Sequence, residues 1–136
     1  MTRRESREQA FALLFEKSFR DKPVEELAAE AAEARDAGTS GFSMTLAQGT
    51  EQHLAEIDER IAACSRKWNK ERISRVAMAV MRVSVYEMLY ETDIPDSVSI
   101  NEAVELAKKY GGEDDSAFVN GILGTISRSR TPEQPQ

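Results

Sequence analysis

The chain is poor in the residues that build most catalytic and metal sites. Its 136 residues include one cysteine, Cys64, and one histidine, His53. A lone cysteine excludes an internal disulfide, and no Cys-x-x-Cys or histidine pair offers zinc ligands. The sequence also has no glycine-rich phosphate loop after a strand and no partnered histidine for a nucleophile. We therefore predict a protein that is not an enzyme and uses no metal or cofactor.

Long apolar runs are also absent. No segment approaches the roughly 18 apolar residues of a membrane span, and the basic start of the chain is not followed by the apolar stretch of a signal peptide. The lone cysteine agrees with a reducing compartment, so we expect a cytoplasmic protein with no membrane contact. The length and the 40% hydrophobic content are sufficient for the core of one domain.

Positive charge is scarce overall but locally concentrated. The net charge of −6 argues against a general nucleic-acid binder. Residues 1–7 nevertheless carry three arginines against one glutamate, and residues 66–75 carry five basic residues against one acidic residue. Basic patches on an acidic protein favour a local contact with an anion or RNA and weak background binding.

Apolar residues recur at intervals of three and four along most of the chain, which predicts helices. No strong strand pattern or internal repeat is present. The predicted class is an all-α single domain of about six or seven helices over residues 1–128, followed by a disordered tail at 129–136. The expected helices span about 3–20, 23–36, 46–68, 71–91, 99–110 and 113–126.

Local signals mark several ends of these helices. Thr2 with Glu5, and Ser99 with Glu102, have the spacing of a capping box, which predicts a helix start at each place. The double glycine at 111–112 predicts a helix end.

One predicted helix is apolar nearly all round. Between residues 76 and 90, only Arg82 and Glu87 are charged. A helix of this kind is usually the buried centre of a bundle.

Two groups of residues are candidates for binding. The first comprises Arg3, Arg4 and Arg7, because guanidinium groups at the start of a helix can donate paired hydrogen bonds to phosphates. The alternative is an ordinary solvated first turn. The second is Trp68, which stands among four basic residues between 66 and 72 and could stack on an RNA base. Trp68 also continues an apolar stripe, as a core residue would.

The sequence resembles the NusB family of bacterial RNA-binding antitermination factors. The most specific likeness is the order Asn-Glu-Ala-Val-Glu-Leu-Ala-Lys, then Phe-Val-Asn-Gly, near the C-terminus. The matching segments are residues 7–15, 68–73, 79–90 and 94–123.

The resemblance implies two packed three-helix units and binding to the boxA sequence of nascent ribosomal RNA. It implies NusE, a small-subunit ribosomal protein, as partner, within an RNA polymerase complex that contains other Nus factors. The NusE surface is expected mainly on the C-terminal helices. The RNA-binding positions carried over are the basic residues Arg3, Arg4, Arg7 and Arg82, the aromatic residues Phe15, Trp68 and Phe118, and the acidic Asp114.

A second hypothesis is a helical protein-interaction or dimerisation module without specific RNA binding. Its sequence signal is the apolar edge at Ala77 and Met78, where many relatives carry charged residues. A homodimer is one form of this hypothesis. RNA methyltransferases with a NusB-like domain are a further comparison, but this chain lacks their length and their nucleotide-binding motif.

Overall fold

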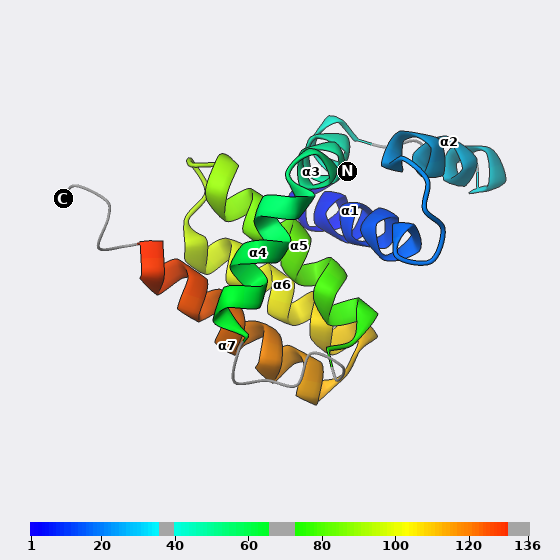
Figure 1. Ribbon diagram of the computed structural model, residues 1–136. Coiled ribbons are helices and arrows are strands. Elements are labelled where there is room, and N and C mark those ends of the chain that lie inside the picture. The colour runs from blue at the N-terminus through cyan, green and yellow to red at the C-terminus, as the bar shows by residue number, and fades with distance from the viewer. Residues whose placement is uncertain (36–39, 66–72, 131–136) are drawn as a thin grey trace.

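The computed structural model describes residues 1–35, 40–65 and 73–130, and these ranges form seven helices and no strand (Figure 1). This confirms the predicted all-α class. The helices are α1 (Arg3–Lys17), α2 (Val24–Arg35), α3 (Gly41–Gln52), α4 (Leu54–Cys64), α5 (Arg75–Tyr90), α6 (Asp96–Tyr110) and α7 (Glu113–Arg130).

The helices pack as two units that contact each other through α5. Helices α1, α2 and α3 contact one another, and α5, α6 and α7 form the second three-helix group. Helix α4 packs against α3, α5 and α7, while α5 also contacts α1 and α3. Figure 1 shows α1 to α3 at the upper right and the remaining helices to the left of them and below. The predicted pair of three-helix units is therefore confirmed.

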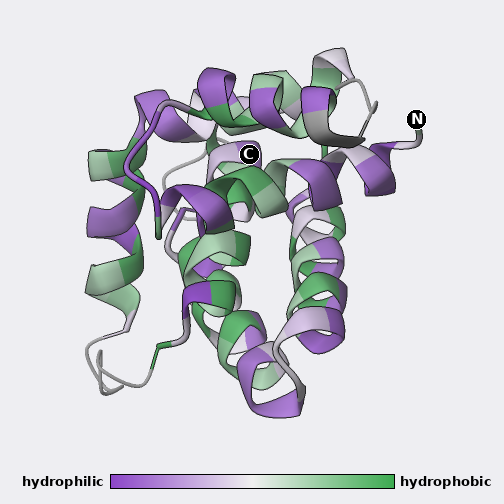
Figure 2. Ribbon diagram, turned by 90° about the vertical axis from the view of Figure 1, so that its right-hand side faces the viewer, coloured by the Kyte–Doolittle hydropathy of each residue, from purple (hydrophilic) through white to green (hydrophobic). Residues whose placement is uncertain are grey.

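Helix α5 is the buried centre that its composition predicted. Met81 and Val85 are fully buried, and only a few of its side chains reach the surface. Figure 2 shows the neighbouring helices carrying both hydrophobic and hydrophilic stretches, as amphipathic helices around one core do. Ala77 is also fully buried, and Met78 packs against the core. Of the apolar edge expected there as a docking surface, Ala77 thus belongs to the core, while the Met78 side chain is half-buried at its border.

The start of α1 was predicted correctly and its end was not. Thr2 accepts a hydrogen bond from the Glu5 amide, and Glu5 accepts one from the Thr2 amide, which confirms the capping box. The helix ends at Lys17, about three residues before the expected end. The Ser18 hydroxyl donates to the Phe15 carbonyl and so takes a backbone acceptor of the last turn. Phe19 consequently leaves the helix and is 59% exposed.

The second predicted capping box is wrong. Helix α6 begins at Asp96 behind Pro95, one turn before the expected start. Proline fixes a backbone angle suited to a helix start, and the Asp96 carboxylate favours the positive end of the helix dipole. Ser99 is therefore inside the helix, where its buried hydroxyl donates to Glu87 at 2.5 Å.

The long helix expected over 46–68 is divided in two. His53 has non-helical backbone angles and separates α3 from α4. The apolar residues keep their three-and-four spacing across the break, so the sequence pattern gave no sign of it. The break lets α3 pack with α1 and α4 pack with α7, while both contact α5.

The C-terminal helix is longer than expected. Gly112 has a φ of 105°, a left-handed angle that suits glycine and confirms the predicted helix end at this point. Helix α7 then runs to Arg130, whose guanidinium lies 3.0 Å from the Asp96 carboxylate. The helix thus includes Ser129 and Arg130, the first two residues of the predicted tail. The rest of the predicted tail, 131–136, lies outside the described residues.

Two helical glycines should respond oppositely to alanine. A Cβ on Gly49 of α3 would lie 2.2 Å from the Tyr86 ring of α5, whereas a Cβ on Gly121 would meet nothing within 4 Å. We expect Gly49→Ala to lower the free energy of unfolding by about 1–3 kcal/mol through overpacking. Gly121→Ala should raise it by up to about 1 kcal/mol through helix propensity. Urea denaturation measures both, and shifts of the same sign would contradict this packing.

Candidate nucleic-acid interface

The three arginines of α1 have three different environments. Arg3 is exposed, and its guanidinium carbon lies 4.1 Å from the centre of the Phe42 ring on α3. A cation over an aromatic face is an attractive pair that leaves the other donors of the guanidinium accessible. Arg3 is therefore positioned by α3 and still available to an anion.

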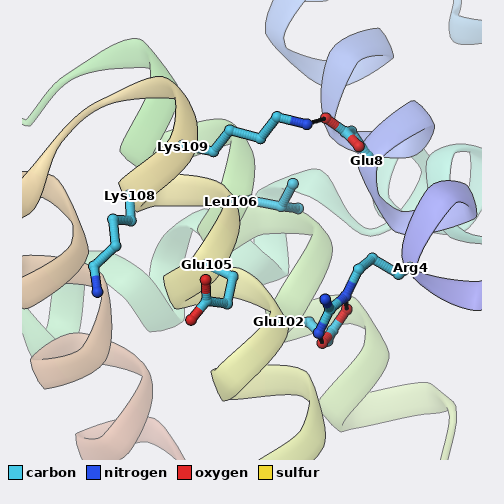
Figure 3. Close-up of a pocket in the computed structure, with 7 residues that line it drawn as sticks. All are labelled: Arg4, Glu8, Glu102, Glu105, Leu106, Lys108 and Lys109. Atoms are coloured by element: carbon cyan, nitrogen blue, oxygen red, sulfur yellow. Dashed lines mark hydrogen bonds and ion pairs between the residues drawn. The ribbon is translucent and has the colours of Figure 1, made fainter.

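Arg4 points to the other side, toward α6. Its Nε and Nη2 atoms donate to the two carboxylate oxygens of Glu102 at 3.1 and 2.8 Å (Figure 3). The Arg4 side chain is 72% exposed, whereas that of Glu102 is 15% exposed. The hydrogen bonds and charge of Arg4 hold the pKa of Glu102 below its usual range.

Arg7 is buried. Its Nε donates to Glu87 of α5 at 2.8 Å, and the two side chains are only 9% and 1% exposed. Ser99 donates to the other Glu87 oxygen, and Glu102 lies 3.8 Å from the Arg7 guanidinium. The sequence predicted Arg7 as a phosphate ligand, and in the structure its guanidinium joins α1 to α5 and α6.

A charged cleft separates α1 from α6 (Figure 3). Its volume is about 370 Å³, and across it Lys109 of α6 lies 2.8 Å from the Glu8 carboxylate of α1. Tyr110 also donates to Glu8, and hydrogen bonds from Lys109 and Tyr110 lower the pKa of that carboxyl. The cleft is lined by Arg4, Glu8, Glu102, Glu105, Leu106, Lys108 and Lys109.

Phe15 belongs to a row of aromatic rings along α1. The centre of its ring lies 5.9 Å from that of Phe11 and 5.1 Å from that of Phe19. Phe11 in turn lies 5.2 Å from Tyr110, and the Arg75 guanidinium lies 4.5 Å from the centre of the Phe19 ring. A groove of about 490 Å³ follows this row between α1 and α2. Phe11 is buried, whereas Phe19 and Tyr110 are exposed and can stack on unpaired bases.

Sequence reasoning missed most of this row. Apolar spacing marks helix faces that become buried, and it gave no indication that Phe19 and Tyr110 are exposed. Arg75 belongs to the basic run at 66–75, but its ring partner Phe19 and the pairing of Phe42 with Arg3 had no local signal, because these partners lie far apart in the chain.

The two site residues predicted on α7 lie near its start. Asp114 is exposed, while Phe118 is partly buried against the core. The neighbouring Asp115 accepts a hydrogen bond from Ser74 at 2.7 Å, which ties the start of α7 to the start of α5.

Arg82, another predicted RNA-binding residue, forms its ion pair away from the arginines of α1. Arg82 donates to both carboxylate oxygens of Asp58 at 2.8 and 2.9 Å and links α5 to α4. Trp68 and its basic neighbours lie outside the described residues.

Cys64 packs at the edge of the core, where burial raises the pKa of its thiol. Among the described residues, no three His, Cys, Asp or Glu side chains are grouped to hold a metal ion. None of the helices in the described ranges is long and apolar enough to cross a membrane.

The fold and this surface define a small all-helical binding protein whose charged and aromatic side chains are gathered around α1. The NusB family model matches residues 4–128. The chain therefore belongs to the NusB family.

Curated relatives match nearly the whole chain. The transcription antitermination protein NusB of Pseudothermotoga lettingae is 38% identical over 136 residues, which are 98% of this chain and 97% of that protein. The NusB protein of Geobacter sulfurreducens is 39% identical over 128 residues, which are 92% and 93% of the two chains.

Solved structures share the fold. NusB of T. maritima superposes with a TM-score of 0.80 at 36% identity and covers 94% of this chain and 92% of its own. A crystal structure of the antitermination factors NusB and NusE in complex with double-stranded RNA matches with a TM-score of 0.83 at 25% identity. That match covers 93% of this chain and 96% of the other.

Proposed function

We propose that this protein is a transcription antitermination factor that binds RNA together with NusE. The observation that carries the proposal is the match of nearly the whole chain to NusB antitermination proteins, including one solved with NusE and RNA. The RNA we propose is the boxA segment of nascent ribosomal transcripts. The protein would act in the cytoplasm, in the RNA polymerase complex that contains other Nus factors.

We infer that RNA approaches the α1 side of the molecule. Arg3 and Arg4 are exposed there and can donate paired hydrogen bonds to phosphates. Phe15 belongs to the aromatic row that offers stacking surfaces further along the same helix. We propose Asp114 and Phe118 as further contacts from α7.

The other predicted residues have different roles in this proposal. Arg7 and Arg82 are proposed to hold α1 and α4 against α5, because each is bound to a carboxylate of another helix. Trp68 stays a predicted stacking residue.

NusE is proposed to bind mainly the C-terminal helices α4 to α7. This leaves the arginines at the start of α1 accessible to RNA. A combined surface would also explain how an acidic protein with few accessible cations binds RNA selectively, since the partner can add contacts of its own.

The proposal is tested by measuring the binding of a boxA-type RNA at near-physiological salt, with and without purified NusE. A scrambled RNA of equal length is the control. We expect a preference for the boxA-type RNA that increases when NusE is present. Equal binding of the two RNAs under both conditions would overturn the proposal.

The same samples test the dimerisation hypothesis by sedimentation at several protein concentrations. Ala77 is buried and only Met78 remains half-buried at the apolar edge on which that hypothesis rested, which leaves little apolar surface there for a second copy. We therefore expect a sedimentation coefficient that does not depend on protein concentration.

A further inference from the structure

One ion pair between α1 and α6 joins an exposed side chain to a mostly covered one. Arg4 is largely in solvent, while Glu102 is mostly covered and held in place by its helix. Both carboxylate oxygens of Glu102 accept hydrogen bonds from Arg4. This two-point geometry is the one that a guanidinium also uses for a phosphate. A phosphate that binds Arg4 in this way must first displace Glu102.

We propose that Glu102 competes with RNA phosphates for Arg4 and thereby limits the affinity of this protein for RNA of any sequence. The inference rests on the proposed RNA binding and names a residue that tunes it. Glu102 is not an RNA ligand in this account, because it acts only through Arg4.

The competition is present throughout the neutral pH range. The pKa of Glu102 is lowered by its hydrogen bonds to Arg4, so the carboxylate stays ionised there. The second guanidinium near Glu102 belongs to Arg7, at 3.8 Å, and it is already bound to Glu87. Arg4 is therefore the cation that Glu102 can release to an incoming phosphate.

The opposite end of the cleft repeats the arrangement. Lys109 is held by Glu8 across the same gap between the two helices (Figure 3). Two cations that face the cleft thus each have a carboxylate from the other helix. Since phosphate contacts carry no base information, such neutralisation weakens binding to all RNAs alike.

The test compares Glu102→Gln with the wild-type protein, using the boxA-type and scrambled RNAs in low salt. The glutamine keeps the shape of the side chain and removes its charge. We expect affinity for both RNAs to rise about two- to fivefold, the range that an exposed ion pair supports. The ratio of the two affinities should stay the same.

Glu105→Gln is the matched control. Glu105 lines the same cleft on the same helix, and its substitution changes the net charge equally. Figure 3 draws no hydrogen bond from it to Arg4, on which its charge acts only as a minor influence. Its RNA affinity should rise less than that of Glu102→Gln. Equal gains would show a general charge effect and overturn the proposal.

An Arg4→Ala background supplies the decisive comparison. There, Glu102→Gln should give no further gain, because no guanidinium remains to be released. A gain that persists would mean that the carboxylate repels RNA directly, and this would overturn the proposal. Glu102→Ala must likewise raise RNA affinity when Arg4 is present and leave it unchanged when Arg4 is replaced. Thermal unfolding confirms that each variant is folded.

The two proposals fail in different ways. If the wild-type protein binds RNA selectively and Glu102→Gln binds no better, only the role of Glu102 is overturned. If the wild-type protein binds neither RNA, with or without NusE, both proposals are overturned.

Discussion

Replacing Arg7 with alanine is expected to lower the free energy of unfolding by about 3 kcal/mol or more. The substitution leaves the Glu87 carboxylate, which is 1% exposed, without the cation that compensates its burial. Ser99 alone would remain as its hydrogen-bond donor. Urea denaturation monitored by circular dichroism measures the loss.

Two further variants show whether the lost stability comes from the buried ion pair. Arg4→Ala breaks an exposed pair on the same helix and should leave the free energy of unfolding almost unchanged. Combining Arg7→Met with Glu87→Leu replaces the buried ion pair by apolar side chains and should recover much of the lost stability. If Arg7→Ala were as stable as Arg4→Ala, the buried pair would not hold α1 in place.

Replacing Arg3 and Arg4 together with alanine is expected to lower RNA affinity at least tenfold. Both side chains are exposed at the start of α1, and each is placed to neutralise a phosphate. Each lost phosphate contact should also reduce the slope of the log–log salt dependence by about one. Fluorescence polarisation of labelled RNA at several salt concentrations measures both quantities. Arg7 is left intact, so that a loss of affinity is not a loss of folding.

Arg60→Ala with Arg128→Ala is the control for this pair. These two arginines are also exposed, but they lie on α4 and on the last turns of α7. The control removes the same charge and should change RNA affinity much less. If both double variants lost equal affinity, RNA binding would depend on the net charge of the protein and not on the arginines at the start of α1.

Several features of the fold follow from local sequence alone. The spacing of apolar residues is enough to identify an all-α chain, because a helix must bury one face wherever it forms. Thr2 and Glu5 predicted the start of α1, and the glycines at 111–112 predicted the end of α6, because caps depend on neighbouring residues. The near absence of charge between 76 and 90 predicted the central position of α5, because a helix that is apolar nearly all round is usually buried.

Family membership was also contained in the sequence. The order of motifs over residues 7–123 resembled the NusB family, and the match of residues 4–128 to the family model confirms it. Which side chains contact RNA remains a prediction, since a motif identifies positions and not their surroundings.

Helix boundaries and individual side chains needed the tertiary structure. The break at His53 was hidden because the apolar spacing continues across it, and only packing against α5 and α7 shows why the chain turns there. Ser99 had the spacing of a cap, yet it lies inside α6 because the helix begins earlier, at Asp96. There its hydroxyl donates to Glu87.

The arginines of α1 show most clearly which properties depend on the tertiary structure. In the sequence, Arg3, Arg4 and Arg7 are equivalent cations in the first turns of one helix. Their partners, Phe42, Glu102 and Glu87, lie 39, 98 and 80 residues further along the chain. The sequence by itself determined the all-α class, the cap of α1 and the family. The tertiary structure alone decided which arginine is buried, which is held and which is accessible, because burial and pairing depend on residues that only folding brings together.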